Sequence, residues 1–308
     1  MIVRERPHFF ALFFILRGSV IPRIFPQVLV VFALSTLIVW AHRNLPGYVP
    51  GFSGGPFALL GIALSIFLGF RNNVCFERWW EARKDWGQLI TSSRDLARQT
   101  LILSGRRDDD AAEKRSRLLN LAIAFAQALV GQLRPGADLA KARGRLPAEV
   151  LVPFEASRNR CDFILRQMGG IVAEMRASGT ITDVQFSVLD ATLGRMSAVL
   201  AACERIRNTP VPFGYTLLVH RTAHIFCFLL PFGFADVLGW GTPFMTALVA
   251  YTFFGLDALG DELEDPFGNL PNGLPINALA DTIEINLREA LGESPLPSLP
   301  LARDHILM

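Results

Sequence analysis

A long stretch without charge passes directly into a highly charged one, with no helix-breaking residue between them. No charged residue occurs at positions 52–70, whereas residues 71–86 include seven charged residues and three tryptophans but no proline or glycine. Proline and glycine are the residues that most often interrupt a helix, and a membrane-spanning helix needs about 20 mostly apolar residues. The junction therefore predicts a single helix that leaves a membrane and continues into water.

The composition supports a membrane protein. Hydrophobic residues make up 51% and charged residues 19% of the 308 residues, and the mean hydropathy is +0.34. Soluble domains are typically about 25% charged. The formal net charge of +2 is too small to indicate a nucleic-acid partner, so the expected partner is a lipid bilayer.

Four segments are apolar and long enough to be spans: residues 24–41, 52–70, 208–238 and 239–256. Residues 71–207 differ in character and contain amphipathic helical patterns at 111–133 and 182–207. Thr182, followed three residues later by Gln185, is the expected N-cap of the second pattern. No long strand-like alternation is present, so we predict an all-α protein in which four transmembrane segments are continuous with a cytoplasmic helical bundle.

This pattern divides the chain into four parts: residues 1–70 with the first two spans, a cytoplasmic region at 71–207, the last two spans at 208–256, and a cytoplasmic region at 257–308. Arginines 4, 6, 17 and 23 precede the first span, and the following loop carries only Arg43. Because basic residues concentrate on the cytoplasmic side, we expect both termini in the cytoplasm.

The residues give no sign of an enzyme. The nucleophile-elbow, phosphate-loop, dinucleotide and zinc-protease signatures are all missing, and no two of the four cysteines lie close enough for a CxxC site. We therefore expect no catalytic residue and no cofactor. His220 and His224, four residues apart, could share a metal ion on one helix face; polar histidines near a membrane boundary are the favoured interpretation.

An acidic run follows the fourth span, comprising Asp257, Asp261, Glu262, Glu264 and Asp265. Such runs are usually solvated or paired with basic side chains, and Arg78 and Arg83 are the expected partners. Repeated around an oligomer, the same carboxylates would instead concentrate cations.

The second span places Ile62, Ile66 and Phe70 on one helical face, and the small residues Gly61, Ala63, Ser65 and Gly69 on others. Small residues permit helices to approach closely in membranes. The face of Ile62, Ile66 and Phe70 either packs against other helices or lines a pore. The spacing of these residues alone favours packing.

Four motifs resemble those of the bestrophins, in particular the bacterial homologues: FERWW at 76–80, VPFGYT at 211–216, EDPFG at 264–268 and ADTIEIN at 280–286. The resemblance covers nearly the whole chain. It implies a homopentameric ion channel of the bacterial inner membrane with one central pore, a hydrophobic neck formed by Ile62, Ile66 and Phe70, and a cytoplasmic aperture at Ile181, with Val184 as the alternative.

The resemblance also bears on selectivity. Animal members carry aromatic residues through the neck and conduct anions, whereas two of the three neck positions here are isoleucine. A phenylalanine edge is electropositive, and isoleucine offers no such bias. Bacterial members of this type are associated with monovalent cation conduction, so the resemblance implies Na⁺ or K⁺. A chloride channel of the same architecture is the alternative, and a transporter or non-conducting scaffold is the second.

Calcium regulation of the animal type is not expected. Animal members bind Ca²⁺ through an acidic run directly after Pro-Phe-Gly, and the corresponding residues here, 269–273, read Asn-Leu-Pro-Asn-Gly. Ca²⁺ prefers several oxygen ligands, usually including carboxylates.

Overall fold

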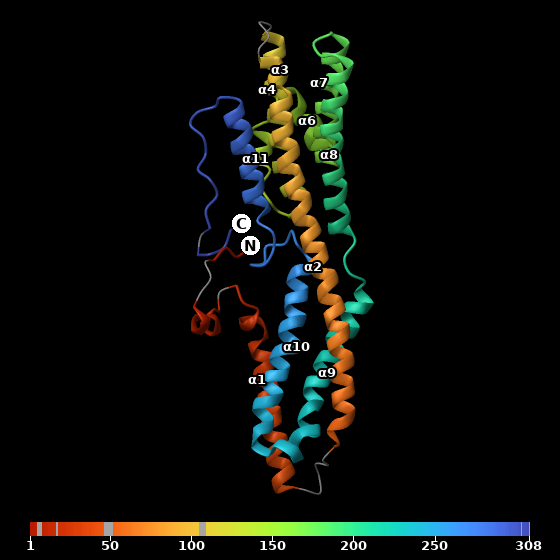
Figure 1. The fold of residues 1–308 in the computed structure, drawn as a ribbon, viewed down its shortest axis with the longest axis vertical. Coiled ribbons are helices and arrows are strands. Elements are labelled where there is room, and N and C mark those ends of the chain that lie inside the picture. The colour runs from red at the N-terminus through yellow and green to blue at the C-terminus, as the bar shows by residue number, and fades with distance from the viewer. Residues whose placement is uncertain (5–7, 17, 46–51, 105–108, 303, 308) are drawn as a thin grey trace. The chain divides into compact units, whose positions relative to one another are not determined.

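The computed structural model describes residues 1–4, 8–16, 18–45, 52–104, 109–302 and 304–307. Within these ranges the chain is almost entirely helical, and its only β pairing is an isolated bridge between Ile2 and Ile306 (Figure 1). The all-α prediction is confirmed. The helices form two compact units, one of residues 4–79 and 210–266 and the other of residues 1–3, 80–209 and 267–308.

The first unit contains the helices predicted to span the membrane. These are α1 (Ile21–Asn44), the first part of α2 (Gly54–Gln99), α9 (Phe213–Leu238) and α10 (Thr242–Glu264), with the short turn η2 (Gly239–Gly241) joining the last two. A short 3-10 helix, η1 (Phe9–Phe14), precedes them. Helix α1 packs most extensively on α10, and the shared core consists largely of Leu, Val, Ala and Phe side chains.

Helix α2 is a single helix of 46 residues, as the junction predicts (Figure 1). The buried positions in its apolar half and just beyond recur every three or four residues: Leu64, Leu68, Arg71 and Cys75. This spacing keeps one stripe of a helix against its neighbours. Every member of the stripe is apolar except Arg71.

The second unit is organised around α4 (Asp109–Leu133), whose residues 121–130 are all buried. It packs against α7 (Arg160–Ala177), α8 (Asp183–Asn208) and α11 (Ile276–Ala290). The shorter helices are α3 (Leu101–Ser104), α5 (Ala140–Arg143) and α6 (Ala148–Ala156).

The predicted start of α8 is confirmed. The Thr182 hydroxyl accepts from the Gln185 backbone N–H and the Gln185 side chain accepts from the Thr182 backbone N–H, which completes a capping box. By length and hydropathy α8 also qualifies as a span. Its buried side packs on α7 and α4, so much of its apolar surface is already covered by protein.

Gly233 of α9 allows the close approach of α2, because a Cβ there would lie 2.5 Å from the Phe57 ring. We expect Gly233→Ala to lower the stability of the protein in detergent by about 1–3 kcal/mol through overpacking, measured by thermal or SDS unfolding. Gly194→Ala in α8 is the matched control, since its Cβ would meet nothing within 4 Å. Equal stability of the two variants would contradict this packing.

Candidate functional site

The face of α2 opposite its buried stripe carries the three predicted neck residues. Ile62, Ile66 and Phe70 are 60%, 51% and 61% exposed, although large apolar side chains are usually covered. The structure thus brings them together on one uncovered face. Their role as a pore neck remains a prediction.

An apolar groove runs beside this face, with a volume of about 430 Å³. Ile62, Ser65 and Ile66 of α2 form one side, and α9 and α10 form the other with Phe226, Leu230, Val249 and Phe253. The groove carries no charged side chain. It is suited to an apolar group, such as a lipid chain or a side chain of another helix.

The small residues of α2 play different parts. A Cβ at Gly61 would lie 3.2 Å from the ring of Phe226, so this glycine permits α9 to pack closely. A Cβ at Gly69 would meet nothing within 4 Å. Close helix contact within one chain is therefore made at Gly61 and not at Gly69.

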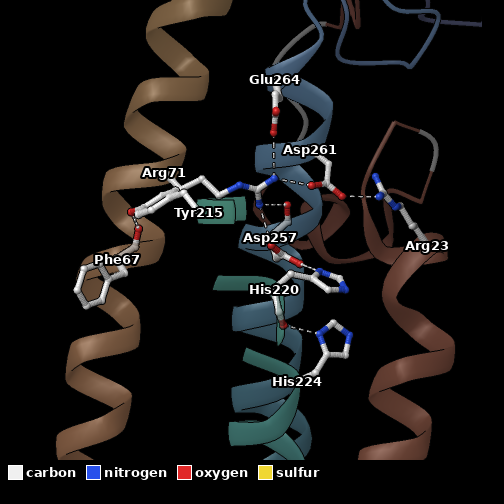
Figure 2. Close-up of polar contacts among 9 residues, drawn as sticks. All are labelled: Arg23, Phe67, Arg71, Tyr215, His220, His224, Asp257, Asp261 and Glu264. Carbon is white, nitrogen blue, oxygen red and sulfur yellow. Dashed lines mark hydrogen bonds and ion pairs between the residues drawn. The ribbon is translucent and has the colours of Figure 1, made fainter. Parts of the chain in front are cut away.

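Directly after Phe70, the side chain of Arg71 is fully buried and surrounded by carboxylates of α10 (Figure 2). Its Nη1 lies 2.7 Å from Asp257 Oδ1, and its Nη2 lies 2.6 Å from Asp261 Oδ1 and 3.3 Å from Glu264 Oε2. Nη1 also donates to the Asp257 backbone carbonyl. A buried guanidinium is tolerated only with such compensation.

The sequence of α10 provides this arrangement. Asp257, Asp261 and Glu264 are spaced by four and three residues and so share one helical face. Gly260 lies between them, where a Cβ would fall 2.6 Å from Asn72 Oδ1 and 3.1 Å from Arg71 Nη1. The glycine thus leaves the space that the guanidinium occupies.

The acidic run is paired with basic side chains, as expected. Arg71 and Arg23 form ion pairs with it, and Arg23 Nη2 lies 2.5 Å from Asp261 Oδ2. Arg78 donates to the backbone carbonyl of Glu264. For Arg83 no ion pair with the run is found in the described part of the chain. Sequence reasoning missed Arg71, although it falls at the heptad-like position between Leu68 and Cys75.

Of the two histidines of α9, His220 joins this cluster and His224 contacts His220. His220 Nδ1 lies 2.6 Å from Asp257 Oδ2, so Asp257 contacts Arg71 and His220 through different oxygens (Figure 2). His224 Nδ1 lies 2.9 Å from the His220 backbone carbonyl, and its ring stacks on Phe254. Among the described residues, no group of three or more His, Cys, Asp or Glu side chains is placed to hold a metal ion.

Helix α9 makes a further polar contact with α2 one turn before Arg71. The Tyr215 hydroxyl donates to the backbone carbonyl of Phe67 over 2.8 Å (Figure 2). The turn that ends at Phe70 is therefore held by α9 on one side and α10 on the other.

The predicted aperture residue lies in the turn between α7 and α8. Ile181 is only 4% exposed, whereas Val184 is 74% exposed. The backbone N–H groups of Thr180 and Ile181 both donate to the Met175 carbonyl and fix the turn. The aperture remains a prediction, and the exposure in a single chain favours Val184 over Ile181 as a residue that faces an open passage.

Comparisons with known proteins agree with the motifs. The family model described as "Bacterial/Fungal Bestrophin protein" matches residues 1–289. A protein of Mesorhizobium japonicum named as a voltage-dependent anion channel-forming protein is 47% identical over 302 residues, covering 97% of this chain and 95% of that one. A Salmonella typhimurium protein with the same type of name is 42% identical over 301 residues, covering 97% and 96%.

Solved structures show the same fold. The crystal structure of a bacterial bestrophin homologue from Klebsiella pneumoniae is similar with a TM-score of 0.82 and 37% identity, and the match covers 88% of this chain and 100% of that chain.

Asp257→Asn tests the importance of the buried ion pair. The variant removes one charge that compensates Arg71, and we expect it to reduce the free energy of unfolding by about 3 kcal/mol. The control is Asp236→Asn, because Asp236 is 56% exposed and pairs with His42; loss of an exposed pair costs about 1 kcal/mol or less. Similar losses in both variants, measured by SDS titration, would argue against a buried ionic cluster.

Proposed function

Because this chain belongs to the bestrophin family of ion channels and is not an enzyme, we propose that several copies surround a pore that conducts small monovalent ions across the bacterial inner membrane. The observation that carries the proposal is the exposed face of Ile62, Ile66 and Phe70 on a helix whose opposite stripe is buried. One chain supplies one such face, and an enclosed passage needs a ring of them.

A homopentamer is the assembly implied by the family likeness. Around a symmetry axis the three positions would form successive rings of Ile, Ile and Phe. Narrow apolar rings exclude water and can gate a pore by dewetting. The aperture would form a second constriction near Ile181 or Val184.

We propose anions, with chloride as the test ion, as the permeating species. The names of relatives that are 47% and 42% identical describe anion channel-forming proteins. These names favour the chloride alternative over the Na⁺ or K⁺ channel that the sequence analysis puts first.

A cation channel is the second candidate, and one observation favours it. Two of the three proposed neck rings are isoleucine, which lacks the electropositive ring edge of an aromatic residue. The neck itself therefore offers no visible preference for anions.

The orientation and the regional division of the chain belong to the same proposal. Arg4 and Arg23 flank the start of α1, and basic flanks favour the cytoplasmic side. With four spans, both termini then lie in the cytoplasm, together with residues 71–207 and 257–308. The expected partners are the permeating ions, the bilayer and other copies of the chain, without nucleic acid.

Purified protein in a planar bilayer with asymmetric NaCl tests the function. We expect single-channel currents whose reversal potential lies near the chloride equilibrium potential. A reversal near the sodium potential would select the cation channel. Absence of current, or a saturating flux without channel openings, would refute the channel. Native mass spectrometry in detergent would determine the number of subunits.

Joint replacement of Ile62, Ile66 and Phe70 by alanine tests the neck. Smaller side chains widen and wet an apolar constriction, so we expect a single-channel conductance several-fold higher. The matched control replaces Leu29, Val30 and Leu37 of α1, which are similarly exposed. Unchanged conductance of the α2 variant, or an equal rise in the control, would contradict the neck assignment.

A further inference from the structure

We propose that Arg71 is a positioning residue of the pore: its contacts with α10 set the rotation of α2 and so determine that Phe70 faces the ion path. The inference rests on the proposed function, because it assigns Arg71 a role in conduction. It starts from the contrast between two neighbours in sequence, since Arg71 is fully buried while Phe70 is 61% exposed.

Helix geometry couples the two side chains. Consecutive residues of an α-helix point about 100° apart, so any rotation that moves Arg71 out of its site moves Phe70 by the same angle. The guanidinium meets carboxylates of Asp257, Asp261 and Glu264 within 3.3 Å. These contacts require the planar, branched donor geometry of arginine, and they are lost on rotation.

Apolar packing alone specifies rotation poorly in a membrane. Lipid tails are as apolar as leucine, so no hydrophobic driving force favours one apolar face of α2 over another. Leu64 and Leu68 of the buried stripe and Ile62 and Ile66 of the exposed face are chemically alike. A buried charge is different, because exposing it to lipid or separating it from its partners is costly.

A second polar contact acts on the same turn. The Tyr215 hydroxyl of α9 bonds to the Phe67 carbonyl, one turn before Arg71 (Figure 2). Phe70 therefore lies between two points at which α2 is held, one by α9 and one by α10. Gly260 keeps the α10 site open, since a Cβ there would lie 3.1 Å from Arg71 Nη1.

Thiol accessibility in the assembled, detergent-purified protein measures the rotation directly. The single substitutions Ile66→Cys, Phe67→Cys and Phe70→Cys each introduce one thiol, which is reacted with a charged methanethiosulfonate. The four native cysteines are buried, and burial also raises the pKa of the Cys161 thiol above its ordinary value, so they provide a low background. On the helix, Phe70 points between the directions of Ile66 and Phe67.

We expect Arg71→Gln to change the reaction rate of the thiol at position 70 by about tenfold, the effect of a 1.4 kcal/mol change, and to shift the rates at positions 66 and 67 in opposite directions. General loosening would raise both of these rates together, and that outcome would overturn the proposal. Arg71→Lys retains the charge but not the planar, branched donor geometry, so we expect an intermediate change in the thiol reaction rates. Arg98→Gln, in an exposed pair with Asp95 of the same helix, is the control without effect.

If Arg71→Gln does not fold, the double variant Asp261→Asn with Glu264→Gln replaces it. This double variant weakens the ion pairs of Arg71 Nη2 and retains the ion pair with Asp257. Opposite shifts of the thiol rates at positions 66 and 67 would again support the proposal, and unchanged rates in the folded variant would overturn it. Bilayer recordings distinguish a failure of the proposed function from a failure of the role proposed for Arg71. Wild-type protein that never conducts refutes the proposed function, whereas a conducting channel with unmoved rates refutes only the role of Arg71.

Discussion

The buried ion pairs between Arg71 and the α10 carboxylates are the interaction on which the membrane-spanning unit depends. In a bilayer, no hydrophobic driving force favours one rotation or one register of an apolar helix over another. A fully buried guanidinium with partners at 2.6–2.7 Å removes this freedom, because the charge must keep its carboxylates. Asp257 extends the connection to α9 through His220. Arg23 of α1 pairs with Asp261, so all four long helices of this unit are linked to the cluster by polar contacts.

This connection gives α2 two unlike faces. One stripe is buried against its neighbours, while the opposite face leaves Ile62, Ile66 and Phe70 uncovered. The chain belongs to a family of ion channels, and the proposed ring of several copies would cover this face. In the proposed pore, the same helix would combine the packing of a structural element with the surface that lines the passage.

The sequence was sufficient for features that depend on local spacing. The length of the apolar stretches predicted the helices of the four candidate spans, helical spacing placed Ile62, Ile66 and Phe70 on one face, and the Thr182 and Gln185 pair predicted the start of α8. That this face is exposed and not packed within the chain did not follow from the spacing. The sequence was insufficient where residues far apart meet. Arg71 and Asp257 are separated by 186 positions, and spacing along one helix does not show which of several arginines a carboxylate will reach. The burial of Ile181 depends likewise on how the α7–α8 turn packs. Ion selectivity depends on the assembled pore.

The position of the charged cluster also limits how much hydrocarbon α2 can cross. Its charge-free part, from Gly54 to Phe70, is 17 residues long, or about 26 Å at 1.5 Å per residue. A typical hydrocarbon core is about 30 Å thick. A span shorter than the hydrocarbon core is accommodated by local thinning of the bilayer, by flanking side chains that reach the interface or by oligomerisation, at a cost of a fraction of a kcal/mol per ångström. Hydrophobic mismatch would then make the protein favour thin membranes, and lipid chain length would affect the helix that carries the proposed neck.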